Sequence, residues 1–403
     1  MPGFEIFGDE ECREVDAVMQ TGILARYGFE EARNGVWKAL ELEQEICKQF
    51  GSSYTQLLSS GTAALTTVLA ALNVGAGHEV ILPVFCDVSC VEAIITIGAI
   101  PVFADIDETL TMSPHSLKKL MTPSTRAVLL VHAVGSVANI TAIKDLCESQ
   151  HVFLLEDSSQ AIGAFMNGRS VGTFGSAGVL SFDFHSTITC GEGGAVITDD
   201  ANLFKLCNEY SDHGHEHLSE NRNSDGHRYM GTNYRLSELH AAVGLAQMKK
   251  LPTIIAQQRR LHQTLRTELE SVSSVAFKNI TLGAEDSCTH LTILLPSQII
   301  TQEVVAALEE NEIPFAYWYD SKWHYIRKWE HFKNGSWMNR LYDDHKRHIL
   351  QHTNLAFPAS DIIMNRCISF AISLRWTEAE ATQRGRKLAI IIQSVLVKEE
   401  TPE

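Results

Sequence analysis

The sequence lacks the features of a protein that binds nucleic acid or a membrane surface. It has no Lys/Arg-rich run, and 33 basic against 49 acidic residues give a net charge of −16. Binding to phosphate backbones or anionic lipids needs basic patches. There is no apolar stretch of about 18 residues. The N-terminal MPGFEIFGDEE has neither the basic nor the apolar segment of a secretory signal. We therefore expect a cytoplasmic protein with no nucleic-acid partner and no membrane association.

Cysteine is present, but not in the spacing of a metal site. The nine cysteines are scattered along the chain. The closest two, Cys86 and Cys90, have no second pair with which to complete a set of four ligands. The cysteines therefore predict no structural metal centre.

Short apolar runs alternate with helical patterns from about residue 50 to residue 200. The clearest runs are EVILP at 79–83, IPVFAD at 100–105, AVLLVH at 127–132 and VFLLE at 152–156. Continuous Val/Ile/Leu runs separated by helices indicate a mainly parallel sheet that is covered by helices on both faces. In such sheets, ligands bind at the carboxyl ends of the strands and at helix N-termini.

The pattern changes near residue 250. Long helical patterns at 236–250 and 254–272 are followed by a mixture of short strands and helices, which ends in an amphipathic helix at 378–397. A chain of 403 residues is too long for one compact core. We therefore expect a large domain over residues 1–250 and a smaller α+β domain over residues 251–403. The stretch 211–230, rich in His, Asn, Ser and Asp, is typical of a long surface or active-site loop.

Two local motifs suggest how a phosphorylated cofactor could be held. The first is the small-residue turn Gly61-Thr62-Ala63, which opens a helix whose free N–H groups and dipole can bind phosphate. An ordinary capped helix start would have the same composition. The second is Asp157, at the end of a buried apolar strand, where a carboxylate can pair with a protonated pyridine nitrogen. A helix N-cap is the alternative interpretation.

Two further segments complete the set, one from Ser181 to Gly194 and one from Gly231 to Leu239. In this order and spacing the four motifs resemble those of the DegT/StrS-like sugar aminotransferases, a fold-type I family that depends on pyridoxal phosphate (PLP). The resemblance covers nearly the whole chain. It implies an α/β fold with a large domain, whose mainly parallel sheet of the seven-stranded type is covered by helices, and a smaller C-terminal α+β domain.

The resemblance also implies roles for individual residues. The cofactor phosphate would be bound by Gly61, Thr62, Ala63 and Ser181. Asp157 would pair with the pyridine nitrogen, and Gln160 would approach the ring hydroxyl. Asn233 would reach the phosphate of the neighbouring subunit's cofactor, which implies a homodimer.

Two other segments, 211–215 and 318–325, resemble one branch of the family, the aminotransferases that make 8-amino-3,8-dideoxy-octulosonate. This implies substrate contacts from His213, His215, Tyr319, Trp323 and His324. The spacing of His213, His215 and His217 would also suit a metal. Because these histidines lie in the segment that resembles a substrate-binding loop, we favour substrate contact and predict no metal.

The sequence departs from the family where the Schiff-base lysine belongs. That lysine lies seven residues before the first glycine of the Glu-Gly-Gly run, which gives Ser186. No lysine occurs between Lys144 and Lys205, so none can slip into register. A serine hydroxyl cannot form an imine, and unaided it is no base near neutrality. Loss of both lysine roles should cost on the order of a thousandfold or more in rate.

A second departure lies at Asp87, where the family has an aromatic side chain that stacks on the cofactor ring. An aspartate cannot stack, but it can present a carboxylate that acts as a base. A laboratory substitution or natural divergence would each produce Ser186, and the second change favours divergence. His185 adjoins the vacant position, but neighbouring side chains of an extended segment point to opposite sides. We therefore favour a packed or surface histidine there, with a catalytic role as the alternative.

Three functions remain open from the sequence. The first is an enzyme that binds PLP or pyridoxamine phosphate non-covalently and acts on a keto-sugar or keto-sugar acid with glutamate as amino donor. Without the lysine it would run a dehydration or another lysine-free reaction, with Asp87 or His185 as base. The second is a non-catalytic subunit that completes the site of a lysine-bearing paralogue in a heterodimer. The third, a ligand sensor, is least favoured because no DNA-binding extension is present.

Overall fold

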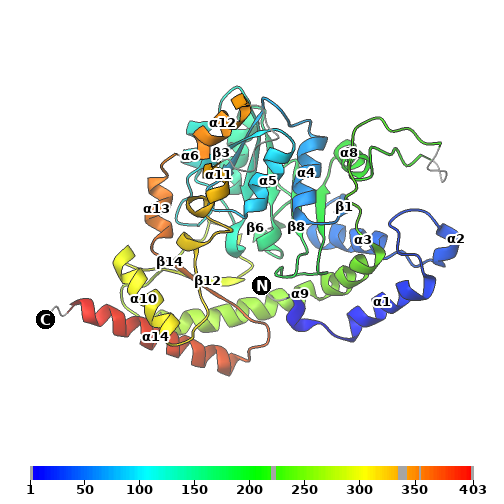
Figure 1. The fold of residues 1–403 in the computed structure, drawn as a ribbon. Helices are drawn as coiled ribbons and strands as arrows, with labels where there is room; N and C mark the ends of the chain where they lie inside the picture. The colour runs from blue at the N-terminus through cyan, green and yellow to red at the C-terminus, as the bar shows by residue number, and fades with distance from the viewer. Residues whose placement is uncertain (1–2, 219–223, 335–342, 354, 401–403) are drawn as a thin grey trace.

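A computed structural model describes residues 3–218, 224–334, 343–353 and 355–400. Figure 1 shows a large sheet covered by helices above a smaller part formed around the long helix α9. The large sheet has seven strands in the order β1-β9-β8-β5-β4-β2-β3. These strands are β1 (Tyr54–Leu58), β2 (Glu79–Pro83), β3 (Ile100–Ala104), β4 (Thr125–Val131), β5 (Phe153–Asp157), β8 (Ala177–Ser181) and β9 (Gly194–Thr198).

The large sheet is mixed, with a parallel centre. Neighbouring strands from β3 to β8 are parallel, whereas β9 runs antiparallel to both β8 and β1. Successive side chains of a strand enter opposite cores: Leu129 packs with the helices of one face and Leu130 with those of the other. This explains the continuous apolar runs of the sequence, since both faces are buried. The predicted α/β class with a helix-covered sheet is confirmed.

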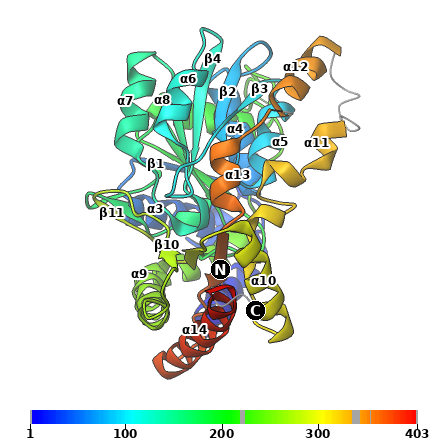
Figure 2. The same cartoon turned by 90° about the vertical axis from the view of Figure 1, so that its left-hand side faces the viewer.

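Helices cover both faces of this sheet. One face carries α4 (Gly61–Ala71), α5 (Val88–Thr96) and α8 (Ala201–Ser211). The other carries α3 (Lys38–Phe50), α6 (Pro114–Leu120), α7 (Ile140–Ser149) and the first half of α9 (Glu238–Leu269). In Figure 2, α7 and α6 lie on one side of the strands and α5 and α13 on the other.

The smaller part is built on a four-stranded antiparallel sheet in the order β10-β12-β14-β13. Its elements are β10 (Ala276–Phe277), β12 (His290–Leu294), α10 (Gln298–Glu310), β13 (Ala316–Tyr317), β14 (Cys367–Ala371) and α14 (Glu378–Glu400). Its core joins Leu265 of α9 to Ile293, Ile368 and Ile392. Between β13 and β14 the chain returns to the large sheet through α11 (Glu330–Asn334), α12 (Asp343–Thr353) and α13 (Pro358–Met364). Figure 2 shows α12 beside β3.

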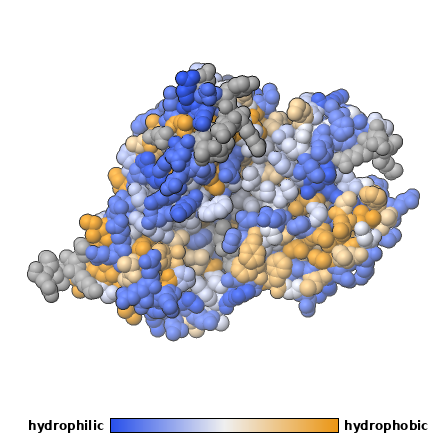
Figure 3. Space-filling view, viewed as in Figure 1, coloured by the Kyte–Doolittle hydropathy of each residue, from blue (hydrophilic) through white to orange (hydrophobic). Residues whose placement is uncertain are grey.

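The remaining elements in the described part of the chain are short or N-terminal. They are α1 (Asp9–Thr21), α2 (Glu30–Arg33), β6 (Phe165–Met166), β7 (Arg169–Ser170), β11 (Ala284–Glu285) and five single turns of 3₁₀ helix, η1 (Gly3–Ile6), η2 (Ala133–Gly135), η3 (Ser159–Ala161), η4 (Trp318–Asp320) and η5 (Ile326–Lys328). No described helix has both the length and the apolar content to span a membrane. Figure 3 shows hydrophobic residues gathered at the lower right, where α9 and α1 lie in Figure 1.

The prediction of two helices at 236–250 and 254–272 is wrong, because α9 is continuous through Pro252. A proline inside a helix costs about 3 kcal/mol. Leu251, Ile254 and Ile255 on either side of it are buried in the core under the large sheet, and this packing outweighs the local cost. The expected domain boundary after residue 250 therefore falls inside a helix. The division into residues 1–250 and 251–403 stays a prediction.

Candidate cofactor and substrate site

The start of α4 and the end of β8 form a close-packed turn. Ser60 caps the helix, its Oγ accepting the N–H of Ala63 at 3.0 Å. A Cβ on Gly61 would lie 2.8 Å from the Cβ of Ser181, and a Cβ on Gly194 would lie 2.7 Å from the nitrogen of Gly61. Glycine is therefore required at both positions for the strand ends to touch the helix start. The N–H groups of Gly61 and Thr62 at the start of α4 lack intrahelical acceptors, and a helix start of this kind favours an anion.

Asp157 ends β5 and is buried, with 6% of its surface exposed. Its Oδ1 accepts the N–H of Ser159 at 3.0 Å, and its Oδ2 accepts the thiol of Cys90 at 3.3 Å. Burial raises the pKa of Asp157, against these two hydrogen bonds, and the charge of Asp87 raises that pKa further. Among the described residues, no lysine or arginine pairs with this carboxylate. The group is therefore suited to a cationic nitrogen of a ligand.

Gln160 follows Asp157 in the same turn. Its Oε1 accepts the N–H of Val134 at 2.8 Å. Val134 has a φ of 47°, a left-handed conformation that is unusual for a branched residue. This hydrogen bond fixes the side-chain amide and leaves its NH₂ group to donate to a ligand oxygen.

Ser186 lies in a tight turn after β8. Its N–H donates to the carbonyl of Asp183 at 3.1 Å, and its Oγ donates to Asp183 Oδ1, also at 3.1 Å. Asp183 Oδ1 also accepts the N–H of His185 at 2.7 Å, which makes the segment an Asx turn. The expectation of an extended segment is therefore wrong. Even so, Ser186 is buried, with 4% of its surface exposed, and His185 is exposed.

Asp87 and His324 face each other across two parts of the chain. Asp87 caps α5, with its Oδ1 accepting the N–H and hydroxyl of Ser89 at 2.9 and 2.6 Å. Its Oδ2 lies 3.6 Å from His324 Nε2, whose Nδ1 is 3.2 Å from Ser321 Oγ. Burial lowers the pKa of His324, whereas the charges of Asp87 and Asp183 raise it. The charge of Asp183, in the Ser186 turn, therefore acts on the same imidazole as the charge of Asp87.

Main-chain hydrogen bonds hold this pair in place. Cys86 N–H donates to the carbonyl of His324 at 3.0 Å, and Val88 N–H donates to that of Trp323 at 2.8 Å. Trp323 is 64% exposed. Tyr319 is half-buried, with its ring 5.7 Å from that of Tyr325. The predicted contact residues Trp323 and His324 therefore border the Asp87 loop.

The predicted loop at 211–230 follows α8, and its residues 219–223 lie outside the described residues. His213 is exposed, whereas His215 is buried. Asn233 is exposed and pairs through its main chain with Asp212. The next residue, Tyr234, accepts the N–H of Ser59 through its carbonyl at 2.8 Å, which ties this segment to the phosphate turn.

Sequence reasoning missed Asp183, Cys90 and Asp212. Asp183 could have been found, because Asp-x-x-Ser is a common turn pattern in which the aspartate accepts local N–H groups. Cys90 lies one helical turn after Asp87, but its contact with Asp157 joins the start of α5 to the end of β5 and has no local signal. Asp212 lies directly after a helical pattern and looks like an ordinary loop residue.

Comparison with known protein structures identifies the fold. The structure superposes on 3-amino-5-hydroxybenzoic acid synthase with a TM-score of 0.81 and 24% identity, over 97% of each chain. It also superposes on Helicobacter pylori PseC, an aminotransferase involved in pseudoaminic acid biosynthesis, with a TM-score of 0.81 and 22% identity over 96% and 97% of the two chains. The fold is that of the fold-type I, PLP-dependent aminotransferases.

Residues 6–384 match the DegT/DnrJ/EryC1/StrS aminotransferase family, and the chain belongs to it. The GDP-perosamine synthase of Vibrio cholerae is 33% identical over 290 residues, which are 68% of this chain and 75% of the relative. The GDP-perosamine synthase of Escherichia coli O157:H7 is 34% identical over 236 residues, 58% of this chain and 64% of the relative.

Proposed function

We propose that the protein binds PLP or pyridoxamine phosphate without a covalent bond and acts on a keto-sugar or keto-sugar acid, with glutamate as amino donor. The observation that carries the proposal is the buried Asp157 carboxylate, whose pKa is raised by burial and which has no cationic side chain as partner among the described residues. A protonated pyridine nitrogen would supply the missing positive charge.

The residues present fit this cofactor. Gly61, Thr62, Ala63 and Ser181 would hold its phosphate, Asp157 its ring nitrogen and Gln160 its ring hydroxyl. The support is the glycine-lined turn, where a Cβ on Gly61 would crowd Ser181 and so narrow the space for an anion. When bound, the cofactor supplies an electron sink for bond changes next to an amine.

We propose Ser186 as the position where the family has its lysine. Ser186 is buried, and its hydroxyl donates a hydrogen bond to Asp183. Because a serine cannot form an imine, the cofactor would have no covalent bond to this position. Asp87, positioned by His324, would then act as the general base that moves the proton. His185 is the weaker candidate base, because its side chain is exposed. The lysine-free alternative, a dehydratase-like reaction, uses the same groups.

The proposed substrate contacts are Tyr319, Trp323 and His324, with His213 from the 211–230 loop. The exposed indole of Trp323 offers a flat apolar face of the kind on which sugar rings stack. The relatives' names refer to an amino sugar, which supports a sugar substrate. The resemblance to the aminotransferases of 8-amino-3,8-dideoxy-octulosonate narrows the proposal to a keto-sugar acid.

A dimer is part of the proposal, and it opens the second candidate function. Tyr229 and Met230 are 53% and 93% exposed and lie just before the exposed Asn233. Apolar side chains presented this way suit an interface with another subunit. Asn233 would then act in a partner's site, so the chain could complete the site of a lysine-bearing paralogue.

The test uses borohydride, which fixes a lysine–cofactor bond irreversibly. The purified chain is loaded with PLP, reduced, digested and analysed by mass spectrometry. We expect no lysine modified stoichiometrically in the natural chain, and modification of residue 186 in Ser186→Lys. A modified lysine in the natural chain would overturn the assignment of Ser186.

Complementation tests the role of Asn233. A double variant, Ser186→Lys with Asn233→Ala, lacks the partner contact in its own homodimer. Mixing it with the natural chain creates mixed dimers in which one site combines the introduced lysine with Asn233 of the natural chain. We expect aminotransferase activity with glutamate to rise on mixing. If the double variant alone is as active as Ser186→Lys alone, Asn233 has no role across the interface.

A further inference from the structure

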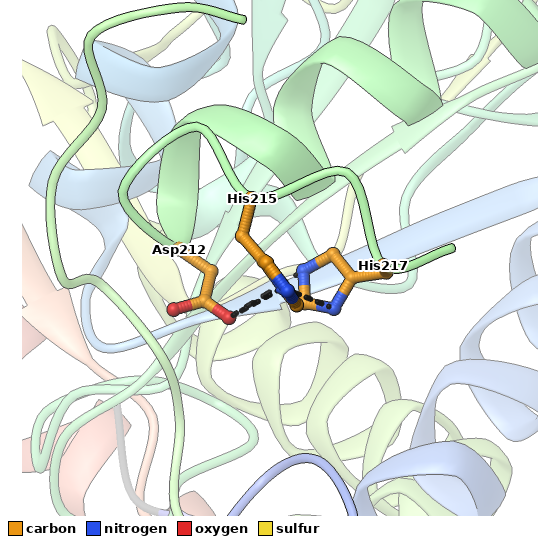
Figure 4. A group of neighbouring side chains, drawn as sticks. All are labelled: Asp212, His215 and His217. Atoms are coloured by element: carbon orange, nitrogen blue, oxygen red, sulfur yellow. Dashed lines mark hydrogen bonds and ion pairs between the residues drawn. The ribbon is translucent and has the colours of Figure 1, made fainter. Parts of the chain in front are cut away.

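The base of the 211–230 loop brings together three groups that are not among the proposed cofactor-binding residues. His215 Nδ1 lies 3.1 Å from His217 Nδ1 and 3.8 Å from Asp212 Oδ2. His217 Nε2 lies 3.5 Å from the same carboxylate oxygen. One ligand atom from each residue falls within 4.8 Å of the other two. Figure 4 shows the two rings turned toward each other, with Asp212 beside them.

We propose that Asp212, His215 and His217 form a binding site for a divalent transition-metal ion, with Zn²⁺ as the best match. Two imidazoles and a carboxylate are ligands that Zn²⁺ uses in proteins, with bonds of about 2.0–2.2 Å, and one such atom from each of the three residues lies within 4.8 Å of the other two. Three protein ligands leave a fourth position for water or a ligand oxygen.

The neighbours of these groups favour such an ion. Asp225 Oδ2 lies 3.0 Å from His215 Nε2, on the side of the ring away from Nδ1, where a carboxylate can act as an outer-shell partner of a metal-binding histidine. Arg235 pairs with Asp212 Oδ1, which orients the carboxylate with Oδ2 toward the rings. The ring of Tyr27 packs 4.4 Å from that of His217.

The backbone is shaped to present these side chains. His217 has a φ of 53°, a left-handed conformation that costs energy in a residue other than glycine. Gly214 has a φ of 77°, and a Cβ there would lie 2.9 Å from the carbonyl carbon of Tyr229. The two arms of the loop also pair at His215 and His227. Asp212 and His215 are buried, so their position is set by packing.

The loop contains its own matched control. His213 and His217 both have left-handed φ values, 60° and 53°, and asparagine tolerates this conformation better than most residues. His213→Asn and His217→Asn therefore make equal demands on the backbone, but only His217 belongs to the cluster. His348 and His352, four residues apart on α12, offer a competing surface site. All chains should carry His348→Gln and no polyhistidine tag.

The experiment is equilibrium dialysis of the full chain against Zn²⁺, followed by metal quantification. We expect one ion per chain, an affinity changed less than about threefold by His213→Asn, and an affinity at least 100-fold weaker in His217→Asn, because loss of an outer-shell partner alone costs about 10–100-fold. Asp225→Asn should weaken binding about tenfold. Absence of stoichiometric binding, or equal losses in the two asparagine variants, would overturn the proposal.

A measurement on the chain with an intact loop removes any dependence on folding of the variants. X-ray absorption at the zinc edge of the loaded chain should show a first shell of nitrogen and oxygen with the outer scattering of two imidazoles. A sulfur shell, or a single imidazole, would contradict the assigned ligands.

Discussion

The two halves of the candidate cofactor site are built in different ways. The phosphate half is made of main chain, where Gly61, Gly194 and Ser181 allow strand ends and a helix start to touch. The reacting half is made of side chains that come from separate elements, with Asp183 holding Ser186 and Asp87 facing His324. Main-chain geometry tolerates few substitutions, whereas a side-chain cluster can change its chemistry without disturbing the fold. If the proposed function is correct, this difference would let a site of this family keep cofactor recognition while its reactive residues change.

The largest expected effect tests the main-chain half. Gly194→Ala places a methyl group 2.7 Å from the nitrogen of Gly61 and forces the phosphate turn to move. We expect about 100-fold weaker PLP binding, equivalent to about 2–3 kcal/mol and typical of over-packing. The measurement is a titration of PLP absorbance.

Ser186→Ala is the control from the other half, and its PLP affinity should change less than about threefold, or about 0.7 kcal/mol. If both variants lose affinity equally, the two halves do not differ as described.

The next effect tests whether the reacting half is sensitive to pH. The ring of Trp318 packs against both His324 and His290, at 5.1 and 5.7 Å. Burial lowers the pKa of His290 to about 3 from an ordinary value of 6.5. Between these values the unfolded chain binds a proton that the folded chain does not, so stability falls as pH drops below 6.5. The slope from this one group is about 1.4 kcal/mol per pH unit.

His290→Phe should remove that slope while keeping an aromatic ring beside Trp318. Urea unfolding at a series of pH values below 6.5 measures it. His262, whose pKa burial lowers to about 4, keeps a separate part of the acid sensitivity. An unchanged slope in His290→Phe would mean that another group causes the sensitivity.

A smaller effect is expected at Asp157, where the two halves meet. Asp157→Asn replaces a carboxyl group, whose pKa is raised by burial, with a neutral amide. The substitution should increase the melting temperature of the cofactor-free chain at neutral pH. It should also weaken PLP binding about 10–100-fold, because a hydrogen bond to a charged group contributes about 1.5–3 kcal/mol. Calorimetry with and without PLP gives both quantities. A lower melting temperature of the cofactor-free variant would contradict the unpaired state of the carboxylate.

The smallest effect on cofactor binding is expected at Asp87. Asn caps helices as well as Asp does, so Asp87→Asn should leave the melting temperature unchanged. PLP affinity should change less than about threefold, or about 0.7 kcal/mol. Turnover, where it is measurable, should fall at least tenfold if Asp87 carries protons. A large loss of PLP affinity would place Asp87 in the cofactor-holding half instead.

The sequence predicted the local parts of the fold better than the long-range ones. The strand at 79–83 has the predicted bounds, because an uninterrupted apolar run defines it. Strand β1 was missed, since its Tyr54, Thr55 and Gln56 are polar. The buried Gln56 is satisfied by long-range hydrogen bonds, among them one from Asn208 at 2.9 Å. Strand β14 was missed as well. Neither strand has the continuous apolar pattern on which the other predictions relied.

The candidate site shows the same division. The turn at 61–63, Asp157 and Ser181 could be located from the sequence because each follows a strand or opens a helix. Their roles stay predictions. The pairing of Asp87 with His324 could not be foreseen, because the two residues are distant in the chain and no local pattern links them. The spacing of His213, His215 and His217 also suited metal ligands, but substrate contact was favoured instead. The cluster could not be located from spacing, because the positions of Asp212, His215 and His217 relative to one another depend on the loop backbone.

The N-terminal segment has a practical consequence for work on this protein. The N–H of Gly3 donates to the carbonyl of Ser186 at 3.1 Å, and a Cβ on Gly3 would lie 2.6 Å from the carbonyl oxygen of Thr187. Glu5 accepts the N–H of Leu374 at 2.7 Å. Gly3 and Glu5 therefore connect the Ser186 turn to the smaller part of the molecule through hydrogen bonds. A substitution at Gly3 or Glu5 would act on both the Ser186 turn and the smaller part.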